Sequence, residues 1–306
     1  MPTTDRGGLV LAEERPRSRR ARRVFGVFAL VLVLGLGYAG WLGLRGVLTG
    51  PFSPTCTALV PGGTAKVSPE QAGNAAVISA VSVTRGLPTR AAVIGVATAI
   101  QESKLRNLRF GDRDSLGLFQ QRPSQGWGTA EQILDPVYAS GAFYDRLVKV
   151  KDWATRPLTE VAQAVQRSAA PAAYAQHEDE ALALASALTG AAPGSLTCDL
   201  ARPDAAGAGA AAASALAAEL GAAAAVEGGV LRVASSQTVP AWAVGQWLVA
   251  RAAQYGVTSV QVGDRLWTRA DGEHWQTTSA GAGTGTTEAG ASTTGTTVTA
   301  ALAPAR

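Results

Sequence analysis

The stretch AVIGVATAIQESKL, from Ala92 to Leu105, decides the fold that the sequence predicts. Its apolar residues recur at helical spacing and Thr89 can cap its start, so we expect a helix from Arg90 to about Lys104. The small residues that leave one face open to a close neighbour are Ala91, Gly95, Thr98 and Ala99. A helix of this kind is typical of the core of an α-helical domain.

Glu102 lies in the last turn of this expected helix. The negative end of the helix dipole and burial in a cleft would both disfavour a charged carboxylate and raise its pKa. A carboxyl group that stays protonated near neutral pH can act as a general acid. Since a lone Glu on a helix is more often a solvated surface group, the surrounding residues must decide between the two interpretations.

Four blocks around Glu102 occur in the same order as in the lysozyme-like soluble lytic transglycosylases, to which goose-type lysozymes are related. The blocks are Glu102-Ser103, Gly117-Leu118-Phe119-Gln120, Asp135-Pro136 with the stretch Gly141 to Leu147, and Ala164-Val165-Gln166-Arg167-Ser168. Residues 68 to 190 resemble this family. The resemblance implies a lysozyme-like helical domain that cleaves peptidoglycan glycan strands with Glu102 as the general acid.

The last block departs from the family pattern at two positions. Val165 stands where the family has Tyr, and Gln166 stands where it has Asn. The family residues would contact the sugar and orient the carboxylate. Tyr174 follows closely in the sequence, and it either takes the place of the missing Tyr or packs in the core.

The presence or absence of a second catalytic carboxylate would distinguish two possible mechanisms. Glycosidases commonly use two carboxyl groups, whereas the transglycosylases that this chain resembles use one Glu and let the substrate's N-acetyl group attack, which gives a 1,6-anhydro product. Asp112 and Asp114 follow Glu102 closely enough to face the same cleft, or they bond the backbone of a turn. We therefore predict Glu102 as the catalytic residue and retain Asp114 as a further candidate.

An amide-rich stretch, QQRPSQGW, runs from Gln120 to Trp127. Amides can bond sugar hydroxyl and N-acetyl groups, and an indole can stack on a pyranose face. The residues for which we expect substrate contacts are Ser103, Gly117, Phe119, Gln120, Gln121, Trp127, Gln166 and Tyr174. Trp127 is equally compatible with a place in the core.

An apolar segment near the N-terminus predicts a membrane anchor. Residues Val24 to Leu44 include no charged side chain and would form a helix about 31 Å long, enough to span a bilayer. Arginines between residues 15 and 23 would keep the N-terminus in the cytoplasm and export the rest, although a cleavable signal peptide is the alternative. In an oxidising compartment Cys56 and Cys198 are then expected to form a disulfide.

The formal charge of +4 could indicate a nucleic-acid partner. Residues 1–45 hold eight of the 27 basic side chains and three of the 23 acidic ones, which leaves 19 against 20 in the remainder. The exported part is therefore close to neutral, and no nucleic-acid partner is expected.

His177 and His274 have no partner at metal-ligand spacing, so we expect no metal and no cofactor. The expected partners are peptidoglycan strands and the membrane.

The predicted fold class is mainly α: a lysozyme-like domain with a hairpin-like excursion over residues 107–122, one transmembrane helix and a small α/β domain. The α/β domain follows from a strand, helix and strand pattern, and its four tryptophans are either core or a wall-binding face. The expected divisions are a cytoplasmic basic tail 1–23, the anchor 24–44, a linker 45–55, the lysozyme-like domain 56–198, an Ala-rich, partly helical linker 199–225, the α/β domain 226–276 and a disordered tail 277–306.

Two functions are compatible with these residues. The first is an enzyme that cleaves glycan strands at the outer face of the bacterial membrane. The second is a non-catalytic peptidoglycan-binding or scaffold protein that keeps the lysozyme-like fold, which the altered block from Ala164 to Ser168 would favour.

Overall fold

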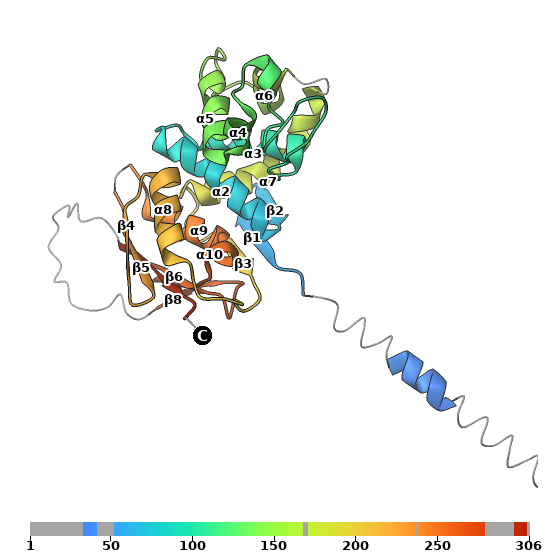
Figure 1. Ribbon diagram of the computed structural model, residues 1–306, viewed down its shortest axis with the longest axis vertical. Helices are drawn as coiled ribbons and strands as arrows, with labels where there is room; N and C mark the ends of the chain where they lie inside the picture. Colours follow the sequence, from blue (N-terminus) through green and yellow to red (C-terminus); the bar gives the residue numbers. More distant parts are fainter. Residues whose placement is uncertain (1–32, 42–51, 168–170, 237, 279–296, 305–306) are drawn as a thin grey trace, which may run out of the picture. The chain divides into compact units, whose positions relative to one another are not determined.

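The computed structural model describes residues 33–41, 52–167, 171–236, 238–278 and 297–304. By its internal contacts the chain divides into two units, Met1–Ser53 and Pro54–Arg306. In the first unit residues 33–41 are helical. The second unit holds all the remaining described helices and both sheets (Figure 1).

The expected transmembrane helix is not found. Of the segment Val24 to Leu44 the structure describes only residues 33–41, and the rest of the segment lies outside the described residues. Among the described helices, none combines the length and the apolar character that crossing a bilayer requires.

The predicted mainly α fold class is wrong. The helices accompany two antiparallel sheets, one in the order β2-β1-β3 and one in the order β4-β5-β9-β6-β7-β8. The strands of the first sheet are β1 (Thr55–Val60), β2 (Gly63–Val67) and β3 (Leu196–Asp199). The strands of the second are β4 (Ala224–Glu227), β5 (Val230–Ala234), β6 (Val257–Val262), β7 (Arg265–Thr268), β8 (Trp275–Thr277) and β9 (Thr297–Leu302). Many of them are short and rich in small residues, so they carry a weak strand signal.

The helical part is built on α2 (Pro69–Thr84), α3 (Thr89–Ser103) and α7 (Glu178–Leu188), which pack against one another. It continues with η1 (Pro123–Gln125), α4 (Ala130–Leu134), α5 (Pro136–Leu147), α6 (Leu158–Gln166) and η2 (Pro171–His177). Gly95 lets α5 approach α3, because a Cβ there would lie 2.9 Å from the hydroxyl oxygen of Tyr144. That hydroxyl donates a 2.9 Å hydrogen bond to the carbonyl of Ile78 and ties α5 to α2.

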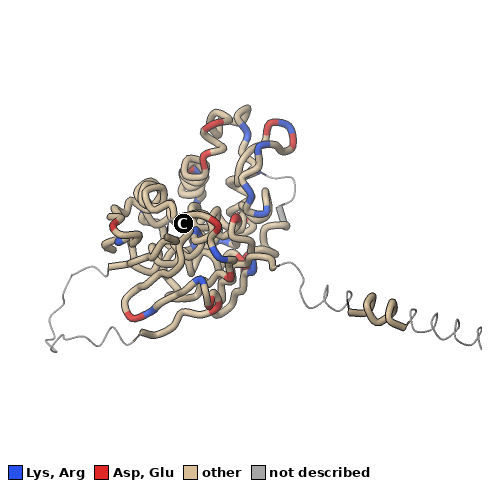
Figure 2. The backbone as a smooth tube through the Cα atoms, turned by 60° about the horizontal axis from the view of Figure 1, so that its bottom comes forward, with Lys and Arg blue, Asp and Glu red and all other residues tan. Residues whose placement is uncertain are grey.

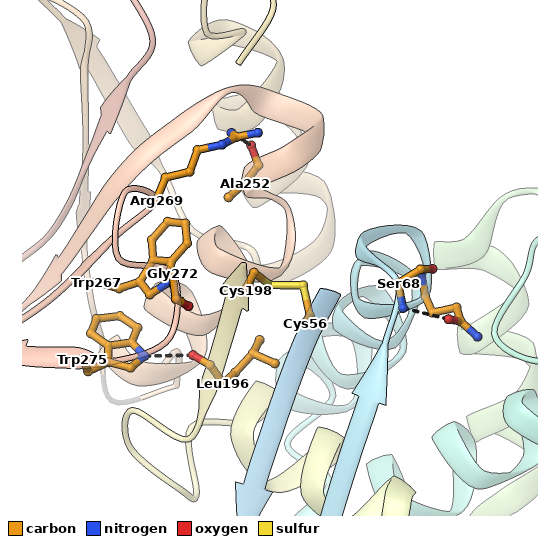
Figure 3. The surroundings of a disulfide bond; sticks show 10 residues. Cys56, Ser68, Leu196, Cys198, Ala252, Trp267, Arg269, Gly272 and Trp275 are labelled. Atoms are coloured by element: carbon orange, nitrogen blue, oxygen red, sulfur yellow. Dashed lines mark hydrogen bonds between the residues drawn. A yellow bond between two sulfur atoms is a disulfide. The ribbon is translucent and has the colours of Figure 1, made fainter. Parts of the chain in front are cut away.

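The disulfide expected between Cys56 and Cys198 is confirmed. The two residues lie directly opposite each other on β1 and β3, and both are fully buried. Figure 3 shows Trp267 and Trp275 beside this strand pair, and the Trp275 indole donates a 2.8 Å hydrogen bond to the carbonyl of Leu196. The disulfide therefore lies where the first sheet meets side chains of the second.

A central strand of the six-stranded sheet comes from the tail that was expected to be disordered. Thr297–Leu302 forms β9, which pairs with β5 on one side and β6 on the other. Val298, Ala300 and Leu302 are buried on one face of the strand, so the expectation of disorder over 277–306 is wrong for these residues. The tail as a whole has few large apolar residues, and pairing with two neighbouring strands holds this part of it, a long-range effect that its composition does not reveal.

Three helices lie between the strands of the second sheet in the sequence or just before it: α8 (Gly209–Leu220), α9 (Ala241–Ala250) and α10 (Ala252–Tyr255). Of these, α8 contacts α2, and α9 contacts both α2 and α7. The amide of Gln246, fully buried in α9, donates to the carbonyls of Ala187 and Ala192 and accepts from the backbone of Leu196. Trp247 and Trp267 are almost completely buried, which gives them core positions rather than places on a wall-binding face.

Candidate active site

Glu102 lies in the last turn of α3, as the sequence predicts, and its side chain is partly buried. The helix ends at Ser103, and Lys104 caps it in the left-handed conformation with φ of 55°. The hydroxyl of Tyr174, in η2, donates a 2.6 Å hydrogen bond to Oε1 of Glu102. Tyr174 is fully buried, so it both packs in the core and holds the carboxyl group.

Burial raises the pKa of Glu102, and hydrogen bonds from Tyr174 and then Gln166 oppose that rise. Burial has the larger effect, because removing a carboxylate from water disfavours its charged form more than the two donors favour it. The net result is a carboxyl group that holds its proton to a higher pH than a solvated Glu. That is the property required of a general acid.

The helix α6 supplies Gln166 but does not supply an aromatic side chain. Val165 is buried in the core, and Gln166 donates a 2.7 Å hydrogen bond to the carbonyl of Phe119. Gln166 thereby links α6 to the Gly117–Gln120 segment and lies close enough to Glu102 to affect its pKa. A tyrosine hydroxyl reaches Glu102 from Tyr174, in the next helical segment, and not from position 165.

Ser103 and Gly117 hold the excursion in place through contacts with the backbone. The Ser103 hydroxyl donates a 2.7 Å hydrogen bond to the carbonyl of Leu118 and is itself buried. Gly117 has φ of 76°, and a Cβ there would lie 2.6 Å from the carbonyl oxygen of Ile133. The two residues fix the excursion against the end of α3, and they do so without exposing a side chain to a ligand.

Three of the expected sugar contacts are packing residues. Phe119 is fully buried and stacks on Phe143 with ring centroids 4.7 Å apart. Gln121 is also buried and donates to the carbonyl of Ala139. Trp127 is only 4% exposed. The expectation that these three side chains contact substrate is therefore not supported, because other side chains or the backbone already cover them.

Gln120 is partly buried and has an unusual backbone, with φ of 47°. Its amide donates to the carbonyl of Gly117 at 3.2 Å. A Cβ on Gly111 would overlap Oε1 of the Gln120 side chain, so Gly111 packs directly against this side chain. The Gln120 side chain therefore lies between Gly111 and Gly117 inside the excursion.

Asp114 bonds the backbone of a turn, which is one of the two roles that the sequence allowed for it. Its Oδ1 accepts a 2.6 Å hydrogen bond from Nε of Arg122, and its Oδ2 accepts one of 2.9 Å from the backbone of Ser124. The Ser124 donors and then Arg122 hold the pKa of Asp114 well below its usual range. With both oxygens engaged, Asp114 is an ionised group that stabilises the excursion.

Two contacts between η2 and the last turn of α3, beside Glu102, were not predicted. Nε2 of His177 lies 2.9 Å from Oε1 of Gln101, and the amide of Gln176 donates to the same oxygen at 3.4 Å. Together with the Tyr174 bond, these contacts attach η2 to the last turn of α3. Gln101 precedes Glu102 in the sequence, but its partners are more than 70 residues away, so no local sequence pattern indicates the pairing.

Among the described residues, no three His, Cys, Asp or Glu side chains gather in a way that could hold a metal ion.

A cavity of about 490 Å³ lies elsewhere, bordered in part by Ser68, Arg202, Asp204 and Arg269. The Arg269 guanidinium is committed to backbone carbonyls there, including those of Ala201 and Ala252. The cavity offers space, but Glu102 combines a carboxyl pKa raised by burial with a hydrogen bond from Tyr174. Burial also raises the pKa of Glu219, but that carboxyl is ion-paired with Arg251 at 2.6 Å. We therefore place the candidate site at the end of α3.

No protein-family model matches this chain, and no curated protein sequence matches it.

Proposed function

We propose that this chain cleaves the glycan strands of peptidoglycan, with Glu102 as the general acid. The observation that carries the proposal is the partly buried carboxyl group at the end of α3, with a raised pKa and a 2.6 Å hydrogen bond from Tyr174. The four blocks that resemble lytic transglycosylases supply the substrate class. The enclosed Cys56–Cys198 disulfide is consistent with an oxidising location outside the cytoplasm, which we include in the proposal.

In the first step the Glu102 proton passes to the glycosidic oxygen as the bond between that oxygen and C1 breaks. The leaving sugar departs as an alcohol, and positive charge develops at C1. Glu102 is left as a carboxylate, the form that the donors Tyr174 and Gln166 favour. It can then take a proton from the hydroxyl group that attacks C1.

Asp114 bears on the choice of that attacking group. Both of its carboxylate oxygens are engaged by Arg122 and Ser124. A one-carboxylate route, in which the substrate's own N-acetyl group assists and its own hydroxyl closes a 1,6-anhydro ring, therefore fits the site better than a two-carboxylate hydrolysis. A reducing-end product would instead require water as the attacking group.

Mass spectrometry of digested peptidoglycan tests the proposal. The wild-type protein should release soluble muropeptides, and Glu102→Gln should release none. Glu227→Gln, an exposed carboxylate on β4, is the matched control and should digest like the wild type. Equal release by Glu102→Gln would rule out Glu102 as the acid, and the ratio of anhydro to reducing ends separates the two product types.

The second candidate is a peptidoglycan-binding or scaffold protein without activity. Two observations favour it: Val165 is part of the core, and Gln166 is committed to the carbonyl of Phe119. Such a protein would sediment with peptidoglycan sacculi and release no soluble product. The same digestion experiment, with a measurement of bound protein, decides between the two functions.

A further inference from the structure

Basic side chains are concentrated in the segment that directly follows Glu102. Between Lys104 and Arg113 the sequence KLRNLRFGDR has four basic residues and one acidic residue. Residues 46–306 as a whole are almost neutral, with 19 basic and 20 acidic groups. All four basic residues are exposed, and Figure 2 shows Lys and Arg segments on the loops in the upper right of the folded unit.

These charges are not neutralised by described carboxylates. Lys104, Arg106 and Arg109 form no ion pair within the described part of the chain, and Arg113 approaches Asp112 only to 3.9 Å. Arginines elsewhere meet carboxylates at 3.0 Å or less, as in the pairs Arg85–Asp145, Arg90–Glu178, Arg122–Asp114, Arg156–Glu160 and Arg251–Glu219. The segment after Glu102 therefore keeps its positive charge available for a ligand.

A second basic group adjoins the site through α6. Arg167 follows Gln166 and is exposed, and the guanidinium carbon of Arg146 lies 3.3 Å from the centre of the Trp127 ring. Burial, and to a smaller extent the positive charge of Arg167, lower the pKa of Arg146. Arg146 donates to the carbonyls of Gln125 and Gly126. Arg146 is therefore engaged with the fold, and Arg167 is the exposed charge of the two.

We define the basic rim as the exposed residues Lys104, Arg106, Arg109, Arg113 and Arg167. We propose that the basic rim binds carboxylate groups on the glycan, so that the protein selects peptidoglycan with peptide stems over uncharged N-acetylglucosamine polymers. The inference rests on the proposed function, which places the glycan at Glu102. In peptidoglycan a lactyl group on alternate sugars is joined by an amide bond to a peptide whose free carboxylates are negatively charged, and chitin has no such groups. Guanidinium groups suit such ligands because they bind carboxylates through two parallel hydrogen bonds.

The binding test uses the full chain with Glu102→Gln, so that cleavage does not consume the ligand. Its sedimentation with insoluble peptide-bearing peptidoglycan should be tighter than with chitin, and 0.5 M salt should reduce the difference, because salt screens exposed charges. Adding Arg106→Gln, Arg109→Gln and Arg113→Gln should weaken peptidoglycan binding by about tenfold and leave chitin binding unchanged. None of the three side chains makes a close ion pair that the fold would lose.

The matched control replaces three exposed basic residues elsewhere, Lys66, Arg202 and Arg232, with Gln. It changes the net charge equally and should bind like its parent. Equal binding of peptidoglycan and chitin, or equal loss in the control, would overturn the proposal. Loss of binding to anionic phospholipid vesicles with peptidoglycan binding intact would also overturn it, in favour of a membrane surface. Selective binding by a wild-type protein that releases no product would retain the basic rim and reject the enzyme.

Discussion

The hydroxyl oxygen of Tyr174 lies 2.6 Å from Oε1 of Glu102, although 72 residues separate them in the chain. The bond favours the ionised carboxylate and so opposes the burial that raises the pKa of Glu102. It also fixes the carboxyl group in one orientation, because Tyr174 is fully buried and cannot swing away without opening the core. Tyr174 is thus a positioning residue that sets the protonation of the candidate acid.

Tyr174→Phe should raise the pKa of Glu102 further, because it removes a donor to the ionised form and leaves the burial in place. Under the proposed mechanism activity falls as pH rises through that pKa, since the acid must be protonated. The falling limb of the variant's pH profile should therefore lie at higher pH than that of the wild type. Carbon-13 NMR titration of the Glu102 carboxyl measures the shift without activity. Tyr138→Phe is the exposed control, and an unchanged titration in Tyr174→Phe would contradict the assignment.

Glu102→Gln should stabilise the protein at neutral pH. Below the ordinary value of 4.5 the carboxyl is protonated in both the folded and unfolded states, so burial costs little. As pH rises through the raised folded-state pKa, the folded state must hold a charge that burial disfavours, and the wild type loses stability. The variant escapes this loss and should gain roughly 0.5–2 kcal/mol at pH 7. Urea unfolding at pH 4 and pH 7 measures it, and a gain of the same size at both would contradict the explanation.

Gly117→Ala should destabilise the excursion more than Gly86→Ala. Both glycines have positive φ, 76° and 66°, so alanine at either position costs about 1 kcal/mol in backbone strain. At Gly117 the new methyl group would also meet the Ile133 carbonyl oxygen at 2.6 Å, whereas nothing lies within 4 Å at Gly86. The clash should add about 1–3 kcal/mol. Unfolding midpoints that are equal in the two variants would show that Ile133 can move aside freely.

Replacing Cys56 and Cys198 together with Ala should lower the free energy of unfolding by up to about 5 kcal/mol, because the disulfide closes a loop with a sequence separation of 142 residues. Alanine adds no polar group to these fully buried positions, so lost loop closure is the main change. Urea unfolding measures the effect, and dithiothreitol should destabilise the wild type but not the variant. A variant as stable as the oxidised wild type would contradict the prediction.

Local signals in the sequence mark the start of α2 and predicted the position of Glu102. Ser68 caps α2, with its hydroxyl accepting from the backbone of Gln71 and the Gln71 side chain accepting from the backbone of Ser68. Such caps are encoded within four residues, so they can be read without knowing the fold. The end of α3 follows in the same way from helical spacing and the loop that succeeds it.

The burial of particular side chains could not be read in that way. Trp127 is covered by Arg146, 19 residues further along the chain, and Gln121 is fixed by the carbonyl of Ala139. Either side chain could have stood in a sugar-binding cleft, and only the tertiary arrangement assigns them to packing. The distinction between a sugar contact and a core residue thus depended on neighbours that the motif itself does not contain.

The strand β9 is the largest departure from the sequence prediction, and it yields the last test. Val298 is fully buried, with Val233 of β5 and Val262 of β6 as its partners in the two ladders. Val298→Ala should cost about 2 kcal/mol, because it removes two buried methyl groups and leaves a cavity. Thr297→Ala, on the exposed residue beside it, is the control and should change stability by less than about 0.5 kcal/mol. Urea unfolding compares them, and equal midpoints would show that residues 297–302 do not form part of the sheet.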